Sequence, residues 1–358
     1  MKKNMNKMAW VLLAFMLVGC GVKETQTESV EEAVIIETTT EEVVEEVLEE
    51  TQETLEVEYP VTLIDQLGRE ITIEKEPETL VSGYYITTSL LIALDQEEKL
   101  VGIEKGADKR NIYSLSAPTL QELPSMGSAK EFNLEGCAAL NPDLVILPFK
   151  LKDVAGSLEE LGITVLFVKP ENQELLEETV EILGTATNAK ERANALLTTM
   201  QNKTQEMSVL IEACEKPTVY ISGNSDFLST AGSQMYQNSL IENAGGVNVA
   251  NDIEDSSWAE VSYEQILAWN PQYIVLASDA KFTVEDVLAD ENLAECEAVK
   301  NGNVYQMPNN IESWDSPVPG SMLGSLWLAS VLHSEEYPNS LYEEAVEGFY
   351  STFYGFMP

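Results

Sequence analysis

The chain has 358 residues, of which 44% are hydrophobic, and this is enough for two domains with cores of their own. Its 61 acidic and 20 basic side chains give a formal net charge of −41, which excludes nucleic acid as a partner because phosphate binding requires clustered Lys and Arg. The single histidine, His333, excludes a metal site built from several histidines.

Residues 1–20 have the pattern of an export signal. A lysine-rich start is followed by an apolar segment over 9–18 that is too short to span a bilayer. The segment ends in Leu-Val-Gly-Cys, which resembles the lipobox of bacterial lipoproteins and makes Cys20 the predicted lipidation site. The alternative is a plain signal peptide with an incidental cysteine. A lipid at Cys20 would hold the protein on the outer side of the cytoplasmic membrane.

Residues 21–57 are rich in Glu, Thr and Val and contain no proline or aromatic residue. No basic residue occurs between Lys23 and Arg69, so like charges repel along this stretch. We therefore expect a disordered acidic tether that spaces the body from the membrane. Its length favours a Gram-positive cell surface over a periplasm.

Strands and helices alternate over residues 58–170, the predicted N-terminal lobe. We expect a hairpin over 61–73, and helices over 87–94 and 153–161. Buried strands are predicted over 80–82, 100–103, 144–147 and 164–168. This alternation is typical of an open, mostly parallel sheet with Rossmann-like connections.

Residues 171–215 are predicted to be helical, with a break at 184–188. The part over 189–214 has no interruption and would form one long rigid helix of about seven turns that joins two lobes. Residues 216–358 form the predicted C-terminal lobe, again α/β, with strands over 218–222, 273–276 and 304–307. Amphipathic helices complete it.

Two segments, 133–147 and 262–276, have nearly the same design. Each has a helix-capping residue (Asn133, Ser262), a glutamate two places later, a short helical stretch, Asn-Pro and then an apolar run suited to a buried parallel strand. A chain that repeats this design has two similar lobes, and two-lobed proteins commonly bind ligands between them.

Beyond Cys20, the chain has three cysteines, which are odd in number and widely spaced. We interpret Cys137, Cys214 and Cys296 as free structural thiols, with one disulfide among them as the alternative.

Six motifs then occur in an informative order behind the lipobox. They are VTLIDQLGRE at 61–70, NLE with NPDLVI at 133–146, IENAGGVNVA at 241–250, VSYEQIL at 261–267, VKNGNVY at 299–305 and LGSLWLA at 323–329. Together they resemble the substrate-binding proteins of ABC importers for ferric siderophores, haem and cobalamin, over roughly residues 59–358. The resemblance implies two α/β lobes joined by one long helix, with the ligand in the cleft between them.

The resemblance also implies that one acidic residue on each lobe docks on the permease, and the matching positions are Glu135 and Glu264. Two equivalent carboxylates suit a permease dimer with its ATPase. The alternative is that each glutamate only complements a helix N-terminus, worth about 0.3–1 kcal/mol. We expect the protein itself to be a monomer.

In open α/β sheets ligands bind beyond the carboxyl ends of the strands. This rule directs attention to aromatic and basic residues in the predicted loops, since aromatic rings offer rigid contact area and bases would attract an anionic chelate. The alternatives are packing beneath a loop and a solvated turn. The candidate ligand-binding residues are Tyr84, Tyr85, Lys105, Arg110, Lys130, Trp258 and Trp314.

The leading hypothesis is a membrane-anchored receptor that passes a ferric siderophore-type complex to an ABC permease. Within the same class, cobalamin or another corrinoid and haem are the alternatives, and a small oxyanion comes third. From other classes come a surface sensor or adhesin and a cell-wall hydrolase. We predict no enzyme activity, catalytic residue, cofactor or protein-bound metal, since the sequence has neither a Gly-x-Ser-x-Gly motif nor a His and carboxylate cluster.

Overall fold

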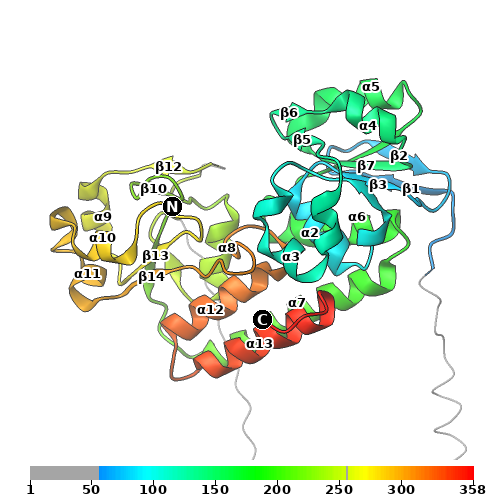
Figure 1. The fold of residues 1–358 in the computed structure, drawn as a ribbon. Coiled ribbons are helices and arrows are strands. Elements are labelled where there is room, and N and C mark those ends of the chain that lie inside the picture. The colour runs from blue at the N-terminus through cyan, green and yellow to red at the C-terminus, as the bar shows by residue number, and fades with distance from the viewer. Residues whose placement is uncertain (1–55, 255–256) are drawn as a thin grey trace, which may run out of the picture. The chain divides into compact units, whose positions relative to one another are not determined.

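The computed structural model describes residues 56–254 and 257–358. Over these residues the fold is α/β, with two main sheets that each carry their own helices and two small two-stranded sheets, β1-β2 and β5-β6 (Figure 1). This confirms the predicted fold class. The leader, Cys20 and all of the tether before residue 56 lie outside the described residues.

The sheet of the first lobe is entirely parallel, in the order β4-β3-β7-β8. Its strands are β3 (Leu80–Ser82), β4 (Leu100–Gly102), β7 (Leu144–Pro148) and β8 (Thr164–Val168). Every residue of β7 is buried, as expected of a central strand that is covered on both faces and therefore reads as a continuous apolar run.

A hairpin of β1 (Val61–Ile64) and β2 (Glu70–Ile73) leads into this sheet and is held to β8 by Arg69. The Arg69 guanidinium lies 2.8 Å from the buried carboxylate of Asp65 and 2.7 Å from the Val165 carbonyl oxygen. It also stacks over the Phe167 ring at 4.6 Å. One cation therefore satisfies a buried carboxylate and packs on an aromatic ring.

Besides its main sheet and the β1–β2 hairpin, the first lobe has several helices and a second two-stranded sheet. These are α2 (Tyr85–Ala93), α3 (Asn111–Ser116), α4 (Leu134–Leu140), α5 (Ala155–Glu159), α6 (Gln173–Ala186), β5 (Gly127–Ser128) and β6 (Glu131–Phe132).

Helix α7 (Lys190–Ile211) follows α6 and leads to the second lobe. Its 22 residues correspond to about 33 Å at 1.5 Å per residue. The break between α6 and α7 falls at 187–189, slightly later than predicted, where Asn188 adopts a left-handed conformation with φ 62°.

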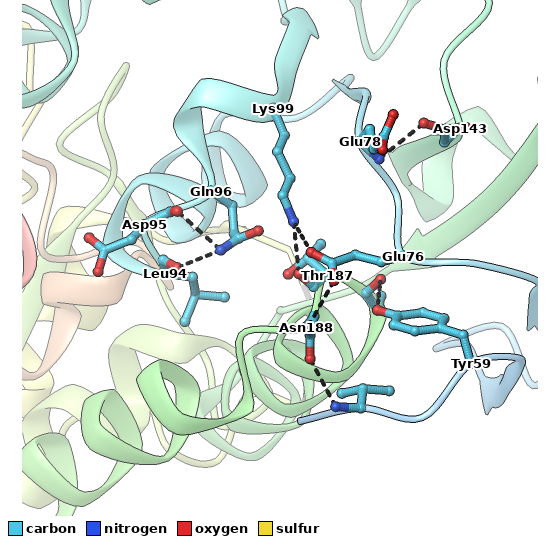
Figure 2. A network of polar contacts seen from close by, with 12 residues as sticks. Tyr59, Glu76, Glu78, Leu94, Asp95, Gln96, Lys99, Asp143, Thr187 and Asn188 are labelled. Carbon is cyan, nitrogen blue, oxygen red and sulfur yellow. Dashed lines mark hydrogen bonds and ion pairs between the residues drawn. The ribbon is translucent and has the colours of Figure 1, made fainter. Parts of the chain in front are cut away.

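Figure 2 shows how the beginning of the described chain is fixed at this break. The Val57 N–H donates to Asn188 Oδ1 at 2.8 Å, and Asn188 Nδ2 donates to Glu76 Oε2 at 2.8 Å. Lys99 Nζ donates to Glu76 Oε1 at 2.8 Å and to the Thr187 carbonyl at 3.2 Å. The Lys99 hydrogen bond is the main cause that lowers the pKa of Glu76. Val57, the last residue of the predicted tether, is thus joined to the first lobe through one polar network.

The sheet of the second lobe is mostly parallel, with β9, β13 and β14 as neighbours. Its strands are β9 (Thr218–Ser222), β10 (Ser229–Thr230), β11 (Val247–Asn248), β12 (Ala259–Glu260), β13 (Tyr273–Leu276) and β14 (Val304–Gln306). Only β10 and β12 run antiparallel to their partners among these described strands.

The helices of the second lobe end in a long C-terminal helix that packs against α7 and α12 (Figure 1). They are α8 (Tyr236–Asn243), α9 (Tyr263–Trp269), α10 (Val284–Leu288), α11 (Glu297–Asn301), α12 (Met322–Leu332) and α13 (Asn339–Phe353).

The chain end after α13 returns to the first lobe. Ser116 Oγ donates to the Tyr354 carbonyl at 2.7 Å, and Arg192 donates to the Thr352 carbonyl at 2.8 Å. The Arg192 guanidinium also stacks over the Phe353 ring at 4.8 Å. The end of the chain therefore contacts the first lobe through Ser116 and helix α7 through Arg192.

The repeated segments have the predicted design in both lobes. In α4 the Asn133 side chain accepts a hydrogen bond from the Gly136 N–H, and in α9 Ser262 accepts one from Gln265. Both helices end at an asparagine with φ 47°, and a buried parallel strand follows Asn-Pro in each case. The predicted cap, helix and strand are confirmed.

The described cysteines are free: Cys137 and Cys296 are buried, and Cys214 is half-buried. No helix of the described residues is long and apolar enough to cross a membrane.

We expect Arg69→Ala to lower the free energy of unfolding by about 2 kcal/mol, because it leaves the buried Asp65 carboxylate without its charged partner. Urea denaturation followed by circular dichroism measures this. Lys203→Ala, which removes an exposed pair with Glu206, is the control and should change stability much less. Equal losses in the two variants would contradict the assigned role of Arg69.

Candidate functional site

The carboxyl ends of parallel strands from both lobes meet at two neighbouring cavities. From the first lobe come the residues after β3, β4, β7 and β8, and from the second those after β13 and β14. A parallel sheet brings all its carboxyl ends to one edge, so loops distant in sequence lie together there.

The first cavity, which we call the polar cavity, has a volume of about 270 Å³. One wall comes from α2 and the segment before and within α3, and the other from the residues after β13 and β14. Its lining residues are Tyr85, Ser89, Lys109, Arg110, Asn111, Ile112, Tyr113, Asp279, Asn309, Ile311, Glu312, Ser313 and Val318.

The second cavity, which we call the proline-lined cavity, has a volume of about 240 Å³. Its first-lobe wall follows β7 and β8, and its second-lobe wall is the start of α8 with Pro317. Its lining residues are Tyr84, Ala129, Pro148, Phe149, Lys150, Val168, Lys169, Pro170, Glu171, Gln234, Met235, Tyr236, Gln237 and Pro317.

Two adjacent tyrosines stand between the cavities. Tyr84 lines the proline-lined cavity and Tyr85 the polar cavity, and their rings meet edge to face at 5.2 Å. Tyr84 is extended and Tyr85 begins α2, so the turn from strand to helix directs the two rings differently. Burial raises the pKa of both phenols, which keeps them neutral hydrogen-bonding groups.

Arg110 is held in place on the wall of the polar cavity. Its guanidinium stacks over the Tyr85 ring at 3.9 Å, and its Nε lies 3.9 Å from Glu104 Oε1. Glu104 is buried and accepts hydrogen bonds from Thr88 Oγ1 at 2.7 Å and Tyr113 OH at 2.8 Å. Burial is the main cause that raises the pKa of Glu104. The buried Arg110 Nε has no hydrogen-bond partner among the described residues. An arginine fixed in this way is ready to bind an anionic group.

Glu312 lies at the floor of the same cavity, 7% exposed, between the lobes. Its Oε1 accepts a hydrogen bond from Ser89 Oγ of the first lobe at 2.5 Å, and its Oε2 accepts one from Tyr350 OH at 3.1 Å. Burial raises the pKa of Glu312 to about 7, although both hydroxyl groups favour the charged form.

The charge at the cavities differs from that of the chain. Lys109 and Arg110 line the polar cavity, and Lys150 and Lys169 line the proline-lined cavity. The two lysines of the latter lie over the Phe149 ring, at 5.8 and 5.3 Å. The acids among the lining residues are Glu171, Asp279 and Glu312. Cations thus outnumber acids at the cavities of a chain whose net charge is −41.

The structure brings together three of the residues predicted to bind ligand, Tyr84, Tyr85 and Arg110. Lys130 is exposed and follows Ala129, which lines the proline-lined cavity. Lys105 is also exposed and lines neither cavity.

Neither predicted tryptophan lines the polar cavity or the proline-lined cavity. Trp314 is 1% exposed, and its indole N–H donates to Tyr350 OH at 2.8 Å. Its neighbours in sequence are polar, but residues after β14 fold over the ring and make it part of the core. Trp258 is half-buried and packs against the core, close to Gly223 after β9.

Sequence reasoning overlooked several lining residues, chiefly Ser89, Asp279, Asn309 and Glu312. A signal for three of them existed, since Asp279 follows the strand predicted at 273–276, and Asn309 and Glu312 follow the one at 304–307. The same strand-end rule identifies them when it is applied to these strands. Ser89 carried no signal, because a serine within an apolar helix is usually a core residue.

Glu135 and Glu264 are both exposed in the first turns of equivalent helices, α4 and α9. The Ser262 hydroxyl is the main cause that lowers the pKa of Glu264. Neither glutamate lines a described cavity. No three His, Cys, Asp or Glu side chains of residues 56–254 and 257–358 are grouped to hold a metal ion.

Several known proteins are similar to this chain. Residues 80–311 match the family described as periplasmic binding protein. The molybdate-binding protein MolA of Haemophilus influenzae is 25% identical over 319 residues, 82% of this chain and 90% of that protein. The uncharacterized ABC transporter substrate-binding lipoprotein YvrC of Bacillus subtilis is 26% identical over 337 residues, 88% of this chain and 94% of that protein.

Solved structures show the same fold. A periplasmic solute-binding protein from Veillonella parvula superposes with a TM-score of 0.72 at 27% identity, covering 83% of this chain and 94% of that one. The molybdate-bound MolA structure has a TM-score of 0.72 at 22% identity, with 83% and 99% covered.

We expect Trp314→Phe to lower the free energy of unfolding by about 1–2 kcal/mol, because it removes the hydrogen bond to Tyr350 and leaves a gap in the core. Thermal denaturation measures the loss. Trp258→Phe is the matched control and should cost less, since Trp258 is half-buried. A larger loss for Trp258→Phe would show that the roles of the two rings are reversed.

Proposed function

The chain belongs to the periplasmic binding protein family, and on this premise we propose that it is the extracytoplasmic substrate-binding lipoprotein of an ABC importer that captures an anionic iron chelate of the ferric siderophore type. The observation that carries the ligand class is the set of cations stacked on aromatic rings at the cavities. A ferric catecholate is both anionic and aromatic, so it offers charge to the cations and flat surface to the rings.

The charge of the cleft differs from that of the rest of the chain. Most of the protein surface repels anions, since the chain carries −41, whereas Lys109, Arg110, Lys150 and Lys169 gather at the cleft. The lining has four cations against three acids, two of the cations being paired with Glu104 and Glu171, so the cleft repels an anionic ligand less than the rest of the acidic chain does.

The size of the site favours a ligand that spans both cavities. Each cavity alone is smaller than the range of about 300–1,000 Å³ that is typical of sites for organic ligands, and the two together fall within it. The touching rings of Tyr84 and Tyr85 would then lie beneath the ligand.

A small oxyanion is the second candidate function. The polar cavity alone, with a volume of about 270 Å³ and a fixed Arg110, is suited to one. The relative MolA is named for binding molybdate. Asp279 and Glu312 line the same cavity and repel a bound anion. The repulsion is stronger for a small anion than for a large chelate, because the charge of the chelate is spread over a larger volume.

Delivery and location complete the proposal. The signal-like residues 1–20 with Cys20 support lipid anchoring at the cell surface, and the relative YvrC is named a lipoprotein. Glu135 and Glu264, exposed on equivalent helices of two lobes, support docking on two equivalent permease subunits with their ATPase.

Tryptophan-fluorescence titration of residues 56–358 tests the ligand class. We expect a ferric tris-catecholate complex to bind with a Kd below about 10 μM, and haem and cobalamin to bind more weakly. Tight binding of molybdate alone would select the second candidate function. If no tested compound binds below this limit, the proposed ligand class is wrong.

We expect Arg110→Ala to weaken binding of the ferric complex by about tenfold or more, because it removes one charged hydrogen-bonding partner worth about 1.5–3 kcal/mol. The same titration measures the change. Lys105→Ala is the control, because Lys105 lies in the same segment and lines neither cavity. Equal effects of the two substitutions would contradict a specific role for Arg110.

We expect Glu135→Lys with Glu264→Lys to abolish ligand uptake by cells that carry the importer and to leave the Kd of the purified protein unchanged, because both side chains are exposed away from the cavities. Uptake of an ⁵⁵Fe-labelled complex and fluorescence titration measure the two effects. Weakened ligand binding in the double variant would show instead that these residues support the cleft.

A further inference from the structure

The floor of the polar cavity holds a carboxyl group that has a satisfactory set of hydrogen bonds in either protonation state. Glu312 is 7% exposed and takes part in a chain of hydroxyl groups from both lobes. The proposed function gives this arrangement no task, since an anionic ligand gains nothing from a carboxylate beside it.

The charged state is satisfied as the structure records it. Tyr350 OH accepts a hydrogen bond from the Trp314 indole N–H at 2.8 Å, so its own hydrogen is directed to Glu312 Oε2 at 3.1 Å. Ser89 Oγ donates to Oε1 at 2.5 Å. Both carboxylate oxygens then accept hydrogen bonds, and the Gly320 backbone amide supports the charged form as well.

The neutral state needs no movement of heavy atoms. With a proton on Oε1, that oxygen donates to Ser89 Oγ, and the Ser89 hydroxyl turns toward Tyr354 OH, 3.2 Å away. Either of these two hydroxyl groups is able to donate to the other. The Tyr350 hydrogen bond to Oε2 is unchanged. Rotation of hydroxyl groups alone therefore adapts the site to the proton.

The charges around Glu312 make its protonation sensitive to a ligand. Arg110 of the first lobe lowers the pKa of Glu312, whereas burial raises it to about 7. Lys109 and Asp279 line the same cavity, and Tyr350 and Tyr354 of the C-terminal segment contact the Glu312–Ser89 pair. An anion that binds Arg110 cancels the favourable field of this cation and adds negative charge to the cavity.

We infer that Glu312 is a specificity-determining residue of the polar cavity, which takes up one proton from solvent when an anionic ligand enters, so that ligand and proton are captured together. This inference rests on the proposed function. The uptake neutralises the carboxyl group that would otherwise repel the ligand. It also selects ligands that pair one negative group with Arg110 and offer an acceptor or donor to a neutral carboxyl group.

The expected dependence on pH follows from linkage. When a group is protonated in the complex and ionised in the free protein, binding requires the uptake of a proton. The association constant then falls as pH rises above the pKa of the group in the free protein, by up to tenfold per pH unit. The wild-type protein should therefore bind a ferric tris-catecholate complex progressively more weakly above about pH 7. Glu312→Gln, which is neutral at every pH, should remove this part of the dependence.

Isothermal titration calorimetry in buffers of different ionisation enthalpy counts the protons directly. At pH 8 we expect the wild-type protein to take up about one more proton per ferric complex than Glu312→Gln does. The difference between the two proteins cancels any proton bound by the ligand itself. Asp279→Asn, the same charge change in the same cavity, is the matched control and should retain the uptake.

A ligand-free arm tests the protein by itself. The raised pKa of Glu312 contributes stability that is present below its unfolded pKa, near 4.5, and is lost as pH rises through about 7. The free energy of unfolding of the wild type should fall over this range relative to Glu312→Gln. Ser89→Ala is a second variant. It removes one hydroxyl group that lowers the pKa of Glu312, so the fall in the free energy of unfolding should extend to higher pH than in the wild type.

The outcomes separate the inference from the proposed function. Binding with equal proton uptake in the wild type and Glu312→Gln overturns the inference and leaves the proposed ligand class intact. Equal pH dependence of unfolding in these two proteins overturns it as well. If neither the ferric complex nor molybdate binds at any pH between 5 and 8, the proposed function fails, and the inference fails with it.

Discussion

The edge where parallel strands end determines where this protein is able to bind. In the described residues, β3, β4, β7 and β8 of the first lobe and β13 and β14 of the second are all followed by residues that line the two cavities. Helices cover the faces of each sheet, so the strand ends are where polar and aromatic side chains remain available. The tyrosine pair, the fixed arginine and the buried carboxyl group all owe their positions to this constraint.

Contacts between the lobes then set the width of the site. At the polar cavity, Ser89 Oγ donates a hydrogen bond to Glu312 Oε1, and Asn111 Nδ2 donates one to the Asn310 carbonyl at 2.9 Å. The segment after α13 adds the Ser116 hydrogen bond to Tyr354. The walls are thus joined by polar contacts as well as by α7, and a ligand that enters competes for groups that already have partners. Glu312 is the main residue for which this holds, because it lines the polar cavity and also accepts a hydrogen bond from Ser89 of the other lobe.

Much of the fold was predictable because its signals are local. Apolar runs marked β7, β8, β9 and β13, and the Asn-Pro pattern marked the ends of α4 and α9. The site was less predictable, because lining a cavity depends on residues far apart in sequence. Trp314 lies among polar residues and is nevertheless buried, through packing that only the assembled second lobe provides. From the sequence, Ser89 resembles an ordinary core residue. In the structure it donates a hydrogen bond to Glu312, which is 223 positions away in sequence.

In the proposed mode of binding, a ferric complex lies across the tyrosine pair, between Arg110 and the residues after β14. Anomalous diffraction at the iron absorption edge, from crystals grown with a ferric tris-catecholate complex, tests it most directly. We expect one strong iron peak in the cleft, close to the rings of Tyr84 and Tyr85. An iron peak only at another surface, or none at saturating ligand, would contradict it.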